Sequence, residues 1–143
     1  MNAEAQKLVD DHPNLATWTD IGDSWEKTAG EGGHDMMVLK ITNKNIAGAK
    51  PKLFISSEIH AREFATAELT TRYSEHLLSN YGKDADVTWM LDHHEIHFLL
   101  FFNPDGRKKA EPNVMWRKNT NRNYCGKNSK NRGVDMNRNF DYQ

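Results

Sequence analysis

The sequence predicts one mixed α/β domain, in which strands and helices alternate along the chain. Two observations lead to this fold class. Segments rich in β-forming residues alternate with segments whose apolar residues recur at helical spacing. The chain has 143 residues, a length at which one domain buries well over half of the surface that the unfolded chain exposes. We therefore expect residues 1–143 to form a single domain.

The N-terminal part is expected to contain a short helix followed by a β-hairpin. Residues 2–11 have a helical pattern that the next segment, HPN, closes. LATWTDIGDSW (15–25) alternates as a strand does, and GEGG (30–33) supplies a turn before DMMVLKITN (35–43). The last two segments are therefore predicted to pair as antiparallel arms.

The middle of the chain is expected to contain two strands with a long helix between them. The segment 52–57 reads as a buried strand, and EIHFLLFF (95–102) is a strongly hydrophobic one. Apolar residues at helical spacing predict a helix from Glu63 to Tyr81, which Gly82 ends.

Three shorter segments complete the expected elements. DVTWMLDH (86–93) predicts a short helix, and NPDG (103–106) fits a type I turn. From Arg107 to Asp135 the chain is polar and is expected to be irregular, as functional loops often are.

Composition limits the class of partner. Nineteen basic and twenty acidic residues, with an isoelectric point near 6.6, predict no general attraction to nucleic acid or to acidic membranes. A single cysteine, Cys125, excludes an intramolecular disulfide and a zinc site of several thiolates. No apolar run approaches the roughly 20 residues of a membrane-spanning helix, and the first residues lack a signal-peptide pattern. A neutral or peptide-like partner is expected.

A polar cluster, IHARE (59–63), follows the first of the two middle strands. His60 is expected at the end of the strand and Glu63 in the first turn of the helix, a junction at which α/β sheets place ligands. An imidazole and a carboxylate at this spacing can supply two ligands of a zinc ion. The spacing alone, however, favours a simpler interpretation, in which the glutamate caps the helix beside a solvated histidine.

DHHEIH (92–97) is a second group of candidate ligands. The alternation of a strand would place His93, Glu95 and His97 on one face, where they could bind a metal adventitiously. A strand entrance that faces solvent explains the same residues more simply, so we expect no functional metal site there.

Three further motifs follow HARE in order along the chain: NPDG, MWRKN (115–119) and GVDMNRNF (133–140). Together the four motifs make the chain resemble the M14 family of zinc carboxypeptidases, the carboxypeptidase A and T group, from about residue 10 onward. The resemblance implies a zinc-dependent metallocarboxypeptidase, a hydrolase that removes C-terminal residues from peptides with zinc-activated water. It also implies a mixed, twisted eight-stranded sheet with helices on both faces, of which this chain would form the N-terminal half.

The resemblance assigns roles to seven residues. His60 and Glu63 match the family's ligands of one zinc ion, and Asp135 matches an aspartate that hydrogen-bonds the zinc-ligating histidine. Arg117 matches the arginine that polarises the scissile carbonyl and holds the oxyanion. The remaining three match residues that bind the peptide: Asn137 and Arg138 hold its terminal carboxylate, and Arg62 contacts it further away.

The family's third zinc ligand and catalytic glutamate lie downstream of NRN, whereas this chain stops at Gln143. We therefore expect the 143-residue chain alone to be inactive and to expose a sheet edge through which it self-associates. The family favours a secreted or periplasmic location. A second function class stays open, that of a non-catalytic protein that binds peptide C-termini and has a weak or incomplete metal site.

Overall fold

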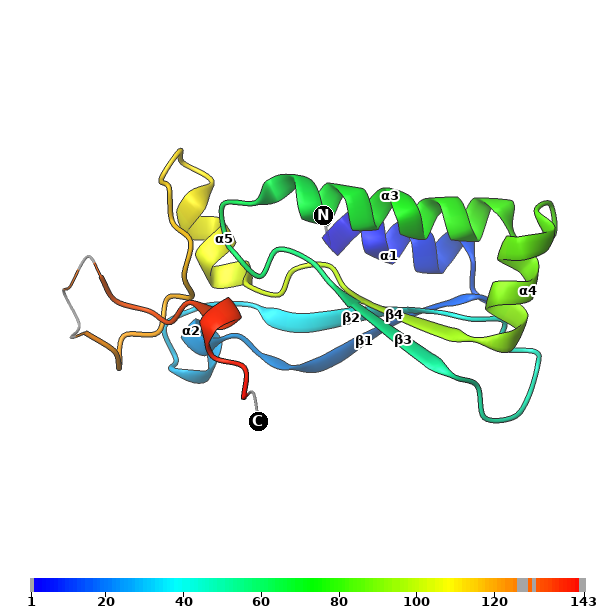
Figure 1. Ribbon diagram of the computed structural model, residues 1–143, viewed down its shortest axis with the longest axis horizontal. Helices are drawn as coiled ribbons and strands as arrows, with labels where there is room; N and C mark the ends of the chain where they lie inside the picture. The colour runs from blue at the N-terminus through cyan, green and yellow to red at the C-terminus, as the bar shows by residue number, and fades with distance from the viewer. Residues whose placement is uncertain (1, 126–128, 130, 142–143) are drawn as a thin grey trace.

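The structure is a computed structural model that describes residues 2–125, 129 and 131–141; Gln143 lies outside these residues (Figure 1). Four strands form one sheet in the order β1-β2-β4-β3. The pairs β1–β2 and β2–β4 are antiparallel and β3–β4 is parallel, so the sheet is mixed, as predicted. The strands are β1 (Ala16–Asp23), β2 (Asp35–Ile41), β3 (Lys52–Ser56) and β4 (Glu95–Leu99).

Helices cover one face of this sheet. The two longest described helices, α1 and α3, run side by side above the strands, and α4 stands at the far end (Figure 1). The helices are α1 (Asn2–Asp11), α2 (Trp25–Thr28), α3 (Phe64–Asn80), α4 (Ala85–His93), α5 (Pro104–Ala110) and the 3₁₀ turn η1 (Met136–Arg138). The predictions of α1, the hairpin, α3 and α4 are confirmed. None of the described helices is long and apolar enough to cross a membrane.

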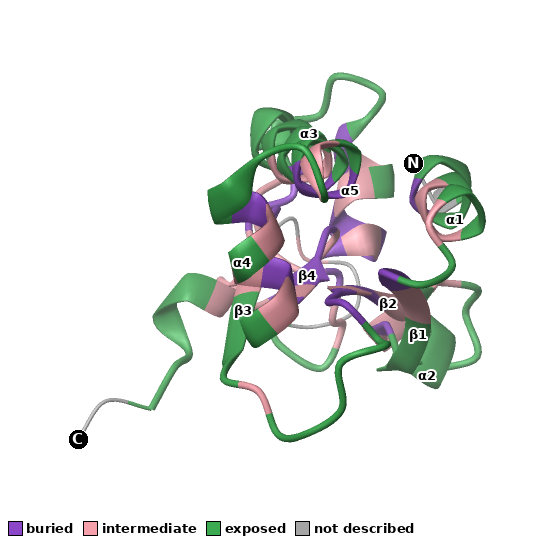
Figure 2. Cartoon of the chain, turned by 90° about the vertical axis from the view of Figure 1, so that its right-hand side faces the viewer, coloured by how far each residue is buried: buried purple, intermediate pink, exposed green. Residues whose placement is uncertain are grey.

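The hydrophobic core lies between these helices and the sheet. Leu39 of β2 and Phe98 of β4 face each other in register, and both are fully buried. Buried residues gather at the centre of the view along the strands (Figure 2). Burying each large apolar side chain stabilises the fold by roughly 1.5–3 kcal/mol. The core residues are Ala5, Leu15, Ala16, Leu39, Ile41, Leu77, Leu78, Val87, Leu91, Ile96, Phe98 and Leu100.

The strand expected at residues 52–57 is present, but the prediction that it is buried is wrong. β3 is an edge strand, and its Leu53 and Phe54 are 51% and 56% exposed. Its apolar composition is that of an inner strand, whereas its place in the sheet depends on pairing with β4, about forty residues later. The exposed edge agrees with the expectation drawn from the family resemblance.

The segment after β4 differs from the prediction in two ways. The strand ends at Leu99 instead of residue 102. NPDG forms the start of helix α5, with Asn103 as N-cap and Pro104 in the first turn, instead of an isolated turn. The Asn103 side chain accepts a hydrogen bond from Gly106 N at 3.1 Å, so the segment begins a helix that continues to Ala110.

The parallel pair β3–β4 directs two connections to one end of the sheet. Beyond the strands, Ser57 N donates to Leu99 O at 3.1 Å and Phe102 N donates to Ser57 O at 3.0 Å. The segment that leads to α3 and the segment that leads to α5 therefore stay together after the sheet has ended. Of the residues predicted for the site, His60, Arg62 and Glu63 lie on the first of these connections, whereas Arg117, Asp135, Asn137 and Arg138 come from the chain after α5.

Candidate metal and substrate site

A short turn between β3 and α3 carries His60 and Glu63. Glu63 N donates to His60 O at 3.0 Å, and Ala61 N donates to Arg117 O at 3.1 Å. Glu63 takes the N-cap position of α3, one residue before the helix, instead of the predicted place in its first turn. These backbone bonds hold His60 and Glu63 beside each other and bring the MWRKN segment next to them.

The imidazole of His60 lies between two carboxylates. Its Nδ1 is 3.0 and 3.1 Å from the two carboxylate oxygens of Glu63, and its Nε2 is 3.1 Å from Oδ1 of Asp135. The side chain is buried, with 7% of the residue exposed. A neutral imidazole has one N–H, so it can donate to only one of these carboxylates. A second proton, or a metal ion between Nδ1 and Glu63, satisfies both contacts.

The pair of donors fits zinc. Two zinc ligands at bonding distance and tetrahedral angle are about 3.4 Å apart, close to the separation of Nδ1 and the Glu63 oxygens. An Nε2–H that points to Asp135 would fix the tautomer that leaves Nδ1 free for the metal. The described part of the chain holds no group of three or more His, Cys, Asp or Glu side chains arranged around one point. His60 and Glu63 could therefore supply two ligands of such an ion.

Arg117 completes a network of charges around the histidine. Its Nε donates to Oδ2 of Asp135 at 2.9 Å, and its Nη1 lies 3.4 Å from Oε1 of Glu63. Arg117 is the main reason why the pKa of the Asp135 carboxyl is below its usual value, and His60 acts in the same direction. Two carboxylates face one guanidinium, so the site is net negative with a neutral histidine and attracts a cation.

The three residues expected to bind the peptide lie around this network. Asn137 lines a cavity of about 230 Å3 together with His60 and Glu63. Arg138 is exposed, and its Nη1 donates to the backbone oxygen of Asn137 at 2.9 Å. Arg62 is also exposed, and its Nη1 lies 3.4 Å from the backbone oxygen of Met115. Asn137 therefore shares the cavity of the candidate ligands, while Arg62 and Arg138 lie at the surface beside it.

Sequence reasoning missed an ion pair beside this site. Glu58 of the turn pairs with Arg107 of α5, and its side chain is fully buried. Burial raises the pKa of Glu58 to about 7, and Arg107 opposes that shift. The signal in the sequence was a glutamate directly after an apolar strand and an arginine directly after NPDG. Nothing in the sequence indicated that the two would meet.

The second histidine segment does not form the arrangement that its alternation predicted. His93 ends helix α4, so it shares no strand face with Glu95 and His97. His97 Nε2 lies 3.1 Å from Oε2 of Glu95 on β4. A two-residue pair of this kind on the sheet is a local polar contact.

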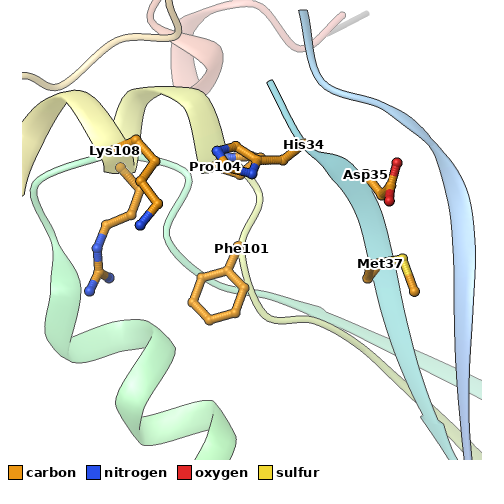
Figure 3. A pocket seen from close by; sticks show the side chains of 7 residues that line it. His34, Asp35, Met37, Phe101, Pro104 and Lys108 are labelled. Carbon is orange, nitrogen blue, oxygen red and sulfur yellow. The ribbon is translucent and has the colours of Figure 1, made fainter. Parts of the chain in front are cut away.

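A separate cavity of about 280 Å3 lies between β2 and α5 (Figure 3). In this view the ring of Phe101 lies between the side chains of α5 and those of β2. Its charged groups already have partners: Asp35 pairs with Lys27, Arg107 with Glu58, and Lys108 with Glu111. This cavity therefore offers no unpaired charge to a ligand. It is lined by His34, Asp35, Met37, Phe101, Pro104, Arg107 and Lys108.

Comparison with known proteins identifies the family. The zinc carboxypeptidase (M14) family model matches residues 1–143. Metallocarboxypeptidase A of Trichophyton tonsurans is 35% identical over 127 residues, and carboxypeptidase A2 of Mus musculus is 33% identical over 142 residues. These matches cover 88% and 96% of this chain, which spans only 28% and 30% of the length of those two relatives.

Solved structures share the fold. The carboxypeptidase A structure from Helicoverpa armigera matches 98% of this chain and 32% of its own, with 31% identity and a TM-score of 0.79. Thrombin activatable fibrinolysis inhibitor matches 95% of this chain and 32% of its own, with 27% identity and a TM-score of 0.80. The sheet and helices described above are thus a part of the carboxypeptidase fold, and the chain belongs to the zinc carboxypeptidase family.

Proposed function

We propose that this chain supplies one part of the active site of a zinc-dependent carboxypeptidase that removes C-terminal residues from peptides. One observation carries the proposal: the two nitrogens of His60 face the carboxylates of Glu63 and Asp135 at 3.0 and 3.1 Å. In this arrangement one ring nitrogen is oriented by an aspartate and the other is directed at a second potential ligand. That is how a metal-binding histidine is held.

Each of four residues has a distinct role in the proposed reaction. His60 and Glu63 hold one zinc ion, and Asp135 keeps the proton of His60 on Nε2. Bound zinc supplies a Lewis acid that lowers the pKa of water toward 7. Arg117 lies within hydrogen-bonding reach of both carboxylates, so its permanent charge stands beside the point at which the scissile carbonyl would be polarised.

The substrate's terminal carboxylate is assigned to Asn137 and Arg138. Both belong to η1, whose first turn is capped by Asp135: its Oδ1 accepts a hydrogen bond from Asn137 N at 3.1 Å. The same aspartate therefore contacts the zinc-side histidine and begins the segment that would bind the carboxylate. This short connection supports a binding position for the free C-terminus about one residue from the metal, and Arg62 would contact the peptide beyond it.

Hydrolysis also needs a third zinc ligand and a base that takes a proton from water. We assign both to the part of the family domain that the relatives have and this chain does not span. The 143-residue chain by itself is then expected to be inactive. If no such residues join it, the alternative holds: a protein that binds peptide C-termini at a weak metal site without cleaving them.

The carboxylate clamp can be tested with Arg138→Ala in the full-length protein. We expect a loss of kcat/KM of about 30-fold or more toward peptides with a free C-terminus, because a charge-assisted contact worth roughly 2 kcal/mol or more is removed. Amidated peptides should already be poor substrates and should change little. The measurement compares both peptides on both proteins at equal zinc occupancy.

Arg138→Lys is the matched control, because it keeps the charge without the two parallel donors and should lose less. If the wild-type protein cleaves the amidated peptide as well as the free acid, or if Arg138→Ala slows both peptides alike, the protein does not recognise the free C-terminus and the carboxypeptidase proposal fails.

Two further expectations belong to the same proposal. The exposed β3 edge, with Leu53 and Phe54, is the surface through which the isolated chain would self-associate, and sedimentation at several concentrations measures this. A secreted or periplasmic location is the expectation that the family resemblance brings.

A further inference from the structure

Both ends of the turn that carries His60 and Glu63 contact the same side chain, Arg107 of α5. The Nη1 atom of Arg107 pairs with Oε1 of Glu58, two residues before His60. The guanidinium carbon of Arg107 also lies 4.1 Å from the centre of the Phe64 ring, one residue after Glu63. One planar cation therefore holds the two flanks of the turn.

The flank at Glu58 depends on this contact. The Glu58 side chain is fully buried, and its backbone has a φ of 58°, in the left-handed region that non-glycine residues rarely adopt. Burying a carboxylate costs free energy unless it is paired. A left-handed backbone conformation at a non-glycine residue persists only when the surrounding contacts hold it. Glu58 N donates to Thr66 Oγ1 at 3.0 Å, and Arg107 supplies the charge that keeps the side chain inside.

Helix α5 is itself fixed against the turn. A Cβ atom added at Gly106 would lie 2.8 Å from the Cβ of Ala61, so the helix rests directly on the residue after His60. Asn103 Nδ2 donates to Lys118 O at 3.0 Å, which ties the start of α5 to the segment that contains Arg117. Arg107 Nε is 3.3 Å from Glu111 Oε1, one helical turn further along.

We propose that Arg107 is a positioning residue for the metal site, which keeps the His60 imidazole and the Glu63 carboxylate facing each other by holding Glu58 and Phe64. This inference rests on the proposed function, because it concerns the two side chains proposed as zinc ligands. Without Arg107, the buried Glu58 carboxyl would lose its ion-pair partner and the Phe64 ring would lose its stacked cation, so both flanks of the turn could move. The separation of the two ligands would then vary, and zinc would bind less tightly.

The test measures zinc binding by the metal-free, full-length protein, through competition with a chromophoric chelator. Arg107→Ala should weaken zinc binding by about 10- to 100-fold, the loss usual for residues that orient metal ligands. Arg107→Lys keeps a charge for Glu58 but not the flat group that stacks on Phe64, so its loss should be smaller. Lys108→Ala, at the next and more exposed position of α5, is the matched control and should bind as the wild type does.

Cobalt separates positioning from a general loss of structure. The visible absorption of Co2+ bound in place of zinc reports the arrangement of its ligands, and we expect altered bands for Arg107→Lys. Metal-free unfolding of each variant is measured in parallel. A variant that unfolds more easily yet keeps the wild-type Co2+ spectrum and zinc affinity would show that Arg107 stabilises the fold only, and would overturn the proposal.

His60→Ala calibrates the experiment. If it leaves zinc affinity unchanged, the proposed metal site is wrong, and the positioning role falls with it. If His60→Ala weakens binding while the folded Arg107 variants bind as tightly as the wild type, only the positioning role is wrong. If Arg107→Ala does not fold, Arg107→Lys decides: weaker zinc binding supports the proposal, and wild-type affinity overturns it.

Discussion

The covered face of the sheet and the polar end of β3 and β4 are held together in different ways. On the covered face, Leu39 and Phe98 pack against helices through contacts that need only shape and burial. At the polar end, His60, Arg117 and Asp135 meet through hydrogen bonds between charged groups from three segments. The covered face stabilises the fold and does not depend on an exact arrangement of its side chains. The polar end depends on exact distances between charged groups, so the two regions should respond differently to mutation and to pH.

Removing Phe98 should have the largest effect on stability. The Phe98 ring is fully buried and packs edge to face against the Tyr73 ring, with 5.9 Å between the two ring centres. Phe98→Ala therefore leaves a cavity in the centre of the core. We expect the free energy of unfolding to fall by about 3–5 kcal/mol, measured by urea denaturation. Zinc affinity of the molecules that remain folded should stay close to that of the wild type.

Phe54→Ala is the matched control, since Phe54 lies on the neighbouring strand but is 56% exposed. Its loss should cost less than about 1 kcal/mol. If the two variants lost similar amounts of stability, the covered face would not be the centre of stability, and the comparison of the two regions would be wrong.

The elements were predictable where local pattern decides them. Helix α3 runs from Phe64 to Asn80, one residue inside the predicted bounds at each end, because Gly82 takes the left-handed conformation that ends a helix. The exposure of β3 was not predictable, because its apolar residues do not reveal whether a second strand lies beside it. NPDG was ambiguous, since an asparagine cap followed by proline begins a turn and a helix alike.

The contacts of the site were also predictable only where they are local in the sequence. The spacing of His60 and Glu63 is local, so the sequence could predict that the two side chains lie together, whereas only the family resemblance suggested that they bind a metal. That Asp135 lies 3.1 Å from His60, seventy-five residues away, is a tertiary contact that only the order of motifs suggested. No sequence motif predicts the ion pair of Glu58 and Arg107, because in the sequence alone neither residue differs from a charged residue at the surface.

A substitution at the polar end should reverse the pattern of Phe98→Ala. Asp135→Asn keeps an oxygen that can accept from His60 but removes the charge that holds both His60 and Arg117. We expect zinc affinity to fall by about 10- to 100-fold, measured by chelator competition in the full-length protein.

The cost in stability should be much smaller than that of Phe98→Ala, because few apolar contacts are lost. Asp141→Asn, at an exposed position six residues along, should change neither quantity and serves as the control. Wild-type zinc affinity in Asp135→Asn would mean that the aspartate does not act on a metal-binding histidine.

The smallest change in stability is expected at Asp92, and it tests whether a charged group beside the covered face also stabilises the fold. Asp92 of α4 accepts hydrogen bonds from Asn43 Nδ2 at 2.8 Å and from the Tyr81 hydroxyl at 2.7 Å. Asn43 and then Tyr81 hold the pKa of Asp92 below its ordinary value of 3.8. The folded state therefore favours the ionised form, and the stabilisation is complete above about pH 4–5 and is lost as pH falls through the folded pKa.

Asp92→Asn should remove this dependence. Because Asp92 is partly exposed and screened by solvent, we expect a loss of only about 0.5–1 kcal/mol at pH 7. Its difference from the wild type should shrink below about pH 4, because the unfolded wild type takes up a proton there before the folded state does. Thermal unfolding between pH 3 and 7 measures this, with Asp10→Asn on the exposed face of α1 as the control that should follow the wild-type curve. A constant difference between wild type and Asp92→Asn over this range would mean that the hydrogen bonds of Asp92 act through shape alone, and the covered face would then owe nothing to charge.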